Sequence, residues 1–170
     1  MFIKKAIAAA MVLGAAGFAS QAMAETATAT FQVRMTILKS CSVTAGTSSD
    51  INLGSVSSTA TGVSGSSAIT VNCSKNTPYY IGLAPSNNNT AGAGTMARTG
   101  TPADTVAYQL RSLSATGPVW GNTATSTDVG NGVSGTGNGG AQSHTVFASV
   151  ANANSTPGNY LDTVTVTVNY

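Results

Sequence analysis

The sequence predicts an all-β protein, and three observations lead to that prediction. Thr, Ser, Gly and Asn account for 25, 20, 19 and 13 residues, which is 77 of the 170 and typical of strands joined by polar turns. Several runs alternate between apolar and polar residues, as a strand with one buried face does. No stretch shows the 3.6-residue period of an amphipathic helix.

The first 24 residues have the features of a signal peptide. Lys4 and Lys5 precede an apolar stretch over residues 6–18, and Ala22-Met23-Ala24 has the small-x-small form that signal peptidase cuts after. We therefore expect cleavage between Ala24 and Glu25. The apolar stretch is shorter than the roughly 20 residues that span a bilayer, so we expect an exported chain with no membrane span after cleavage.

Without this leader the side-chain charges cancel. Only 7% of all residues are charged, and residues 25–170 hold five basic and five acidic side chains. A neutral surface offers no electrostatic attraction to nucleic acid or anionic lipid, and it does little to oppose self-association. We expect no nucleic-acid partner.

The alternating segments can be placed in order along the chain. From Thr26 to Ile37, apolar side chains occupy the odd positions and polar ones the even positions. The final segment, residues 160–170, is the most regular, because three valines project one way and three threonines the other. Shorter strands are predicted between these two, at residues 51–56, 68–73, 79–84, 105–111 and 145–150.

Polar, glycine-rich segments separate the predicted strands. Residues 57–67, 85–102 and 123–143 are expected to be loops, because their small side chains bury too little surface to offset the entropy of ordering them. About seven strands with long loops on one short chain predict a single immunoglobulin-like sandwich. A small barrel is the alternative.

The two cysteines predict one disulfide. Cys41 and Cys73 both follow the leader, so they enter an oxidising compartment, where an even count favours pairing. A metal pair or a catalytic thiol is the rival interpretation. The single histidine offers no ligand cluster, and the spacing matches no zinc motif.

The sequence contains no catalytic signature, and we expect neither enzymatic activity nor a cofactor. His144 is the one candidate base for a hydrolase, but no serine lies in a nucleophile-elbow context. The glycine-rich run at residues 135–139 lacks the following helix that a phosphate-binding loop requires. A secreted carbohydrate-binding module would use Trp120, Tyr79 and Tyr80 as stacking aromatics.

The two outer segments predict an incomplete sandwich. If the sheet lacks the strand that would follow residues 160–170, it exposes an unpaired edge beside an apolar groove. Such an edge is an aggregation hazard unless another chain fills it. The alternating segment after the leader has the right pattern to do so.

Four passages resemble the spore coat protein U domain family, and within it the major pilins of archaic chaperone-usher pili. They are the Ala24/Glu25 boundary with its alternating segment, residues 37–43, residues 69–73, and the ending from Pro157 to Tyr170. The resemblance spans essentially the whole mature chain, and the ending is its most specific part. Residues 85–143 carry little of it.

The resemblance implies an immunoglobulin-like subunit that lacks its final strand and is completed by donor-strand exchange. A periplasmic chaperone lends a strand, an outer-membrane usher catalyses exchange, and the next subunit's N-terminal segment replaces the lent strand. This implies a shaft subunit of an extracellular pilus that supports adhesion and biofilm formation, with a secreted carbohydrate-binding or coat-type structural module as the alternative.

Carried onto this chain, the resemblance assigns domains and residues. Residues 1–24 are the signal peptide, 25–37 the donor segment, whose end is not fixed by the pattern, and 38–170 the pilin domain. The C-terminal carboxylate of Tyr170 anchors to basic residues of the chaperone. The donor side chains are Ala27, Ala29, Phe31, Val33 and Met35, and the acceptor-edge side chains are Val164, Val166 and Val168.

Overall fold

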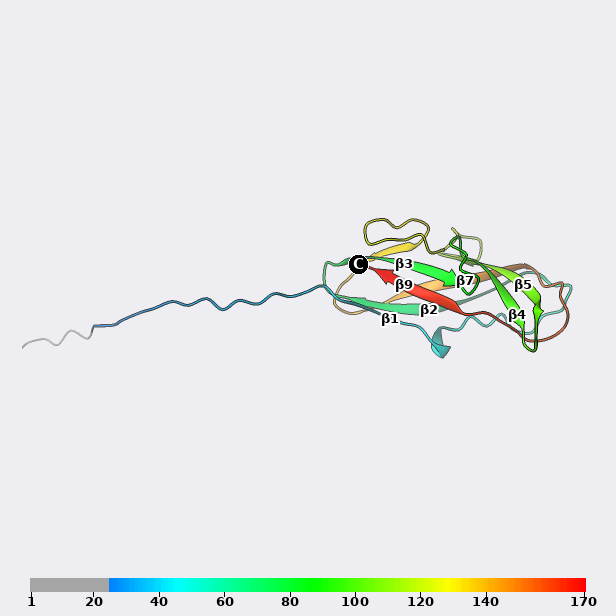
Figure 1. The fold of residues 1–170 in the computed structure, drawn as a ribbon, viewed down its shortest axis with the longest axis horizontal. Helices are drawn as coiled ribbons and strands as arrows, with labels where there is room; N and C mark the ends of the chain where they lie inside the picture. Colours follow the sequence, from blue (N-terminus) through cyan, green and yellow to red (C-terminus); the bar gives the residue numbers. More distant parts are fainter. Residues whose placement is uncertain (1–24) are drawn as a thin grey trace, which may run out of the picture. The chain divides into compact units, whose positions relative to one another are not determined.

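The computed structural model describes residues 25–170 and is all-β apart from one short 3-10 turn, η1 (Thr47–Ser49) (Figure 1). The leader predicted at residues 1–24 lies outside the described residues. Within residues 25–170, no helix is long and apolar enough to cross a membrane. The strands are β1 (Cys41–Thr44), β2 (Thr61–Cys73), β3 (Pro78–Pro85), β4 (Ala93–Arg98), β5 (Thr101–Arg111), β6 (Val133–Thr136), β7 (Ala141–Asn152), β8 (Tyr160–Leu161) and β9 (Val164–Asn169).

The strands of residues 37–170 form two antiparallel sheets. The larger sheet has the order β1-β2-β7-β5-β4-β8, and the smaller has the order β6-β3-β9. The longest pairing joins β2 to β7, from Thr61↔Asn152 to Asn72↔Ala141. This two-sheet arrangement confirms the predicted immunoglobulin-like sandwich over the small barrel.

The core lies between the two sheets and is closed by one tryptophan. Trp120, which is 1% exposed, donates its indole Nε1–H to the carbonyl of Ile81 in β3 at 2.9 Å and its backbone N–H to Leu110 in β5 at 2.9 Å. The loop around Trp120 therefore bridges both sheets. The rest of the core is formed by Ile69, Val71, Cys73, Tyr79, Ile81, Leu83, Val106, Tyr108, Leu110, Val146, Ala148 and Val150.

Residues 51–56 do not form the strand that the sequence predicts. Ile51 and Leu53 instead pack against the inner face of β2, where Gly65 has no side chain. A Cβ on Gly65 would lie 3.1 Å from Leu53 Cδ2 and 3.2 Å from Ile51 Cγ2. This segment thus fills the space between the sheets with side chains and has no strand partner.

Two predicted loops contain strands, and three predicted strands start too late: β2, β5 and β7 begin at Thr61, Thr101 and Ala141 rather than at residues 68, 105 and 145. β4 lies inside the expected loop 85–102, because the two-residue turn Thr99-Gly100 lets it pair with β5; Gly100 has a φ of 82° there. β6 lies inside the expected loop 123–143, where β3 provides its partner. β2 begins at Thr61, within the expected loop 57–67, because β7 continues alongside it.

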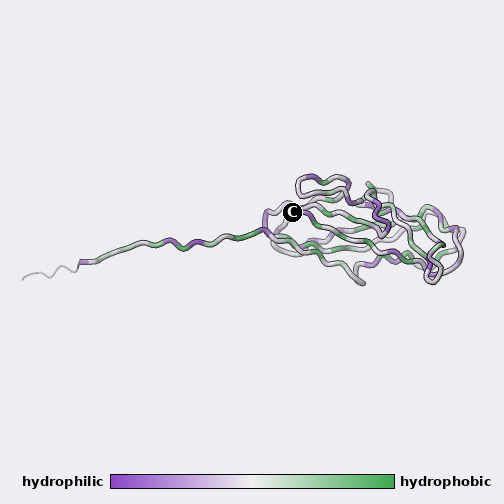
Figure 2. Tube along the Cα trace, in the orientation of Figure 1, coloured by the Kyte–Doolittle hydropathy of each residue, from purple (hydrophilic) through white to green (hydrophobic). Residues whose placement is uncertain are grey.

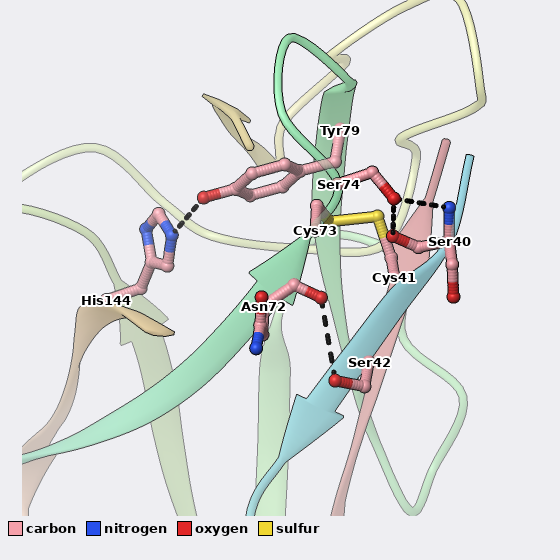
Figure 3. Close-up of a disulfide and its surroundings, with 8 residues drawn as sticks. All are labelled: Ser40, Cys41, Ser42, Asn72, Cys73, Ser74, Tyr79 and His144. Carbon is pink, nitrogen blue, oxygen red and sulfur yellow. Dashed lines mark hydrogen bonds between the residues drawn. A yellow bond between two sulfur atoms is a disulfide. The ribbon is translucent and has the colours of Figure 1, made fainter. Parts of the chain in front are cut away.

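The disulfide predicted between Cys41 and Cys73 is present (Figure 3). The two residues face each other across β1 and β2, with Cα atoms 4.1 Å apart. Ser40 and Ser74 extend the pairing by one position: the Ser74 N–H donates to the Ser40 carbonyl at 2.9 Å, and the Ser40 N–H donates to Ser74 Oγ at 3.0 Å. A short edge strand is thereby fastened at its first residue.

Replacing both cysteines with serine should lower the free energy of unfolding by about 3–4 kcal/mol, because the bond closes a loop of sequence separation 32 in the unfolded chain. Chemical denaturation of the full chain measures the difference. Ser42→Ala is a matched β1 control, since its hydroxyl makes only a long 3.5 Å bond to the Asn72 carbonyl. Equal stability of the Cys-free variant and the parent would contradict the prediction.

Candidate functional site

The free edge of β9 is the first component of the candidate site. β9 pairs with β3 along one side, from Val164↔Pro85 to Asn169↔Tyr80. Along its other side, no strand within residues 25–170 pairs with it. Because alternate backbone N–H and C=O groups of a strand point to opposite sides, this edge presents a row of hydrogen-bonding groups to an incoming strand.

The valines of β9 face the core, as the alternating pattern predicts. Val166 lies opposite Leu83 and Val168 opposite Ile81, and residues directly opposite in a sheet share a face. Leu83 and Ile81 are 1% and 0% exposed, whereas Val164, Val166 and Val168 are only half-buried. The three valines therefore have apolar surface left to cover.

A cavity of about 480 Å³ lies beside the first half of β9. Its wall includes Val164 and Val166 from the small sheet and side chains from the large sheet, so it opens into the space between them. Across from β9 its rim is formed by residues 45–53, which leave β1 after Thr44. The remaining apolar lining is Ile51, Leu53, Ile69, Leu83, Met96, Leu110, Val146, Ala148, Tyr160 and Leu161.

A tyrosine–carboxylate pair separates β8 from β9 at this cavity. The Tyr108 hydroxyl donates to Asp162 Oδ2 at 2.7 Å, and the Thr163 N–H donates to Asp162 Oδ1 at 2.8 Å. β8 pairs with β4 in the large sheet, whereas β9 pairs with β3 in the small one. The chain thus changes sheets at Asp162–Thr163, which interrupts the single strand that the sequence predicts over residues 160–170.

The environment of Tyr108 shifts its titration. Burial raises the pKa of Tyr108 far above its ordinary value, and the hydrogen bond to Asp162 and the negative charge of that carboxylate raise the pKa further. Tyr108 therefore remains a hydrogen-bond donor at any physiological pH. The pair is a fixed feature of the cavity wall.

Residues 25–36 form no strand in this chain, although their alternation predicts an extended segment. Phe31, Val33 and Met35 are 87%, 87% and 82% exposed. Figure 2 shows apolar and polar positions interspersed along this extended trace. Because large apolar side chains are rarely left in water in such a regular row, this segment has the composition of a strand that lacks its sheet.

Tyr170 ends the chain directly after β9. Its side chain is 39% exposed, and the Lys39 Nζ lies 5.7 Å from the centre of its ring. Lys39, which precedes β1, therefore lies beside Tyr170, which follows β9.

The residues considered for other functions occupy structural positions. Tyr79 is 0% exposed, and its hydroxyl is joined to His144 Nε2 by a hydrogen bond of 2.8 Å (Figure 3). Burial lowers the pKa of His144 and raises the pKa of Tyr79. Trp120 is a core residue, so two of the three aromatics expected for sugar stacking are not accessible.

Sequence reasoning missed most of the groove wall. It named Val164 and Val166, which line the cavity, but Ile51, Leu53, Met96 and Leu161 come from segments that it assigned to other roles or left unassigned. Leu161 provided one signal, because it is a large apolar residue on the polar-facing side of the alternating segment, and it is 72% exposed.

The geometry defines a class of protein: an immunoglobulin-like sandwich with an open strand edge and an apolar groove beside it. The family model of the Spore Coat Protein U domain matches residues 27–167. The chain therefore belongs to the Spore Coat Protein U domain family. Among curated proteins, none matches the chain significantly.

One solved structure shares the fold, and a second is similar to a lesser degree. A chain of the CsuC–CsuE chaperone–tip adhesion subunit pre-assembly complex, from the archaic chaperone-usher Csu pili of Acinetobacter baumannii, is similar with a TM-score of 0.53 and 24% identity; the match covers 79% of this chain and 40% of that one. A chaperone–tip adhesin complex of CFA/I fimbriae biogenesis matches with a TM-score of 0.47 and 10% identity, over 71% of this chain and 38% of the other. The chain thus spans well under half the length of either structure that it matches.

Tyr108→Phe should lower the free energy of unfolding by about 1–3 kcal/mol at neutral pH, because Asp162 Oδ2 loses its donor. The raised pKa also predicts a pH effect. Above a pH of about 10, the ordinary tyrosine pKa, Tyr108 ionises in the unfolded chain but stays protonated in the folded one. The free energy of unfolding therefore falls as the pH rises further. Denaturation of parent and variant between pH 7 and 11 should show a shallower alkaline loss in the variant.

Tyr80→Phe is the matched control, because Tyr80 is half-buried and lies on the opposite face of β3 from the core residue Tyr79. A Tyr108→Phe protein with the stability and alkaline profile of Tyr80→Phe would show that the pair does not support the fold.

Proposed function

We propose that this protein is a structural shaft subunit of an extracellular pilus, exported with the leader at residues 1–24 and assembled by the chaperone-usher route through donor-strand exchange. The observation that carries the proposal is the open edge of β9 beside an apolar cavity, in a chain that also holds an exposed alternating segment. Family membership and the likeness to a chain of a chaperone-usher complex support it.

Residues 25–37 of one copy add a strand along the free edge of β9 of the next copy, beside the segment 45–53 that lines the cavity. Backbone groups of the donor pair with the β9 edge, and alternate side chains enter the groove. The inward residues are Ala27, Ala29, Phe31, Val33 and Met35, which meet the half-buried Val164, Val166 and Val168. Burying a large apolar side chain contributes roughly 1.5–3 kcal/mol before ordering costs, so three of them supply a stable contact.

The same groove explains the partners. Before assembly, a periplasmic chaperone covers the edge with a strand of its own and binds the C-terminal carboxylate of Tyr170 through basic residues. The outer-membrane usher then exchanges that strand for the donor of the next copy. Each copy both inserts its own donor segment and accepts one from another copy, so the contact is head-to-tail and propagates as a fibre. Adhesion and biofilm formation are properties of that polymer.

Phe31→Asp should reduce polymer at least about tenfold, because the variant loses the largest buried donor side chain and places a charge in an apolar groove. Thr30→Asp adds the same charge on the opposite face of the same strand, four residues from Arg34, and should polymerise nearly as the parent does. Polymer is measured by electron microscopy and by the ladder of denaturant-resistant oligomers from cells that carry the cognate assembly proteins.

Deleting residues 25–37 should leave a subunit that the chaperone still binds but that cannot donate to another copy. Chaperone pull-down tests the first part and the oligomer ladder the second. Continued growth of polymer from the deletion variant would refute donor-strand exchange by this segment.

A further inference from the structure

The groove carries charge on its rim, and that charge is of one sign. Asp50 and Asp162 are the two charged residues that line the cavity. Among residues 25–170 the one ion pair joins Arg98 to Asp104, so neither of these acids is matched with a base in the described part of the chain. In a protein with so few charges, two acids beside one apolar cavity favour an incoming segment that carries a basic side chain.

The two acids differ in what they already bind. Asp162 is half-buried, and both of its oxygens accept hydrogen bonds, from Tyr108 and from the Thr163 N–H. Asp50 follows η1 and is exposed, and no hydrogen bond to its side chain occurs within residues 25–170. Asp50 is therefore the acid that is available to an incoming group.

The donor segment has one basic side chain, and it lies among the large apolar residues. Within residues 25–36 the charged residues are Glu25 and Arg34, and Arg34 stands between Val33 and Met35. In the single chain its Nε donates to Gln32 Oε1 at 2.8 Å, a contact between two exposed side chains. In a donor strand whose odd-numbered side chains enter the cavity, the even-numbered ones, Arg34 among them, face the outer side. Asp50 is the exposed acid among the residues that line the cavity.

The sizes of the donor side chains indicate the same direction of insertion as the charges do. The donor is small at Ala27 and Ala29 and large from Phe31 to Met35. The cavity lies beside Val164 and Val166 in the first half of β9, and neither Val168 nor Tyr170 lines it. If the large donor side chains occupy the cavity, Arg34 lies beside the start of β9. Both acids, Asp50 and Asp162, line the cavity there.

We propose, on the basis of the function proposed above, that Arg34 of the entering copy pairs with Asp50 on the rim of the accepting groove. The pair sets the direction of the donor, antiparallel to β9, and opposes entry of strands with an acid at this position. Asp162 adds to the negative potential of the same end. The partner that the groove selects is thus a second copy of this chain, recognised by charge as well as by shape.

Charge reversal and its repair test the pairing in the full chain. Arg34→Glu and Asp50→Arg should each slow polymer formation about two- to fivefold, the range for an exposed ion pair, and the double variant should return to the parental rate. The difference between single and double variants should shrink in high salt. Lys75→Glu changes the net charge as Arg34→Glu does, at the turn between β2 and β3, and should polymerise as the parent does.

Chemical coupling provides a second readout that does not depend on rates. In polymer of the Arg34→Lys variant, a carbodiimide should join the introduced amine to Asp50 of the neighbouring copy, and mass spectrometry identifies the linked peptides. Asp50→Asn in the same background removes the acid and should abolish this link. Coupling to other acids with none to Asp50 would overturn the proposal, as would a double variant no faster than the slower single variant.

The outcome separates this pairing from the proposed function. If Phe31→Asp blocks polymer while all charge variants assemble equally, donor insertion stands and the Arg34–Asp50 pair is refuted. If Phe31→Asp assembles normally, donor insertion itself is wrong, and the pairing falls with it.

Discussion

The unpaired backbone edge of β9 is the constraint on which the rest of the structure depends. A strand with one partner leaves half of its N–H and C=O groups to water, and here that edge borders apolar surface. Water can form hydrogen bonds with the backbone groups, but contact with water is unfavourable for the apolar surface of the half-buried valines. The fold therefore leaves unpaired backbone groups and apolar surface along the same edge.

The surrounding elements support this edge without closing it. The Tyr108–Asp162 pair ends β8 and starts β9 in the other sheet, so the groove has walls from both sheets. The Cys41–Cys73 bond fastens the short β1 at its first residue. Ile51 and Leu53 then fill the space over Gly65 and line the cavity. Each feature holds one wall in place.

The sparse charge of the chain gives a few side chains large influence. Residues 25–170 hold five basic and five acidic side chains, so the contacts between copies that we propose would be governed by strand pairing, apolar fit and local charge. In the polymer that we propose, two charged features favour one direction of donor entry over the other. They are the acids that line the cavity and the basic residue among the large donor side chains. The proposed polymer needs this preference, because a donor inserted in the opposite direction would place its small residues, rather than its large ones, in the cavity.

The sequence by itself determined the features that are local or that depend on composition. Alternation fixed which face of residues 164–168 turns inward, the cysteine count fixed the disulfide, and the absence of a helical period fixed the fold class. Tertiary structure decided which segments became strands. Ile51 and Leu53, from a predicted strand, pack over Gly65 instead, whereas β4 and β6 form within predicted loops because β5 and β3 provide partners. Strand pairing and groove walls join residues far apart in the chain, and the period of a single segment does not encode its neighbour.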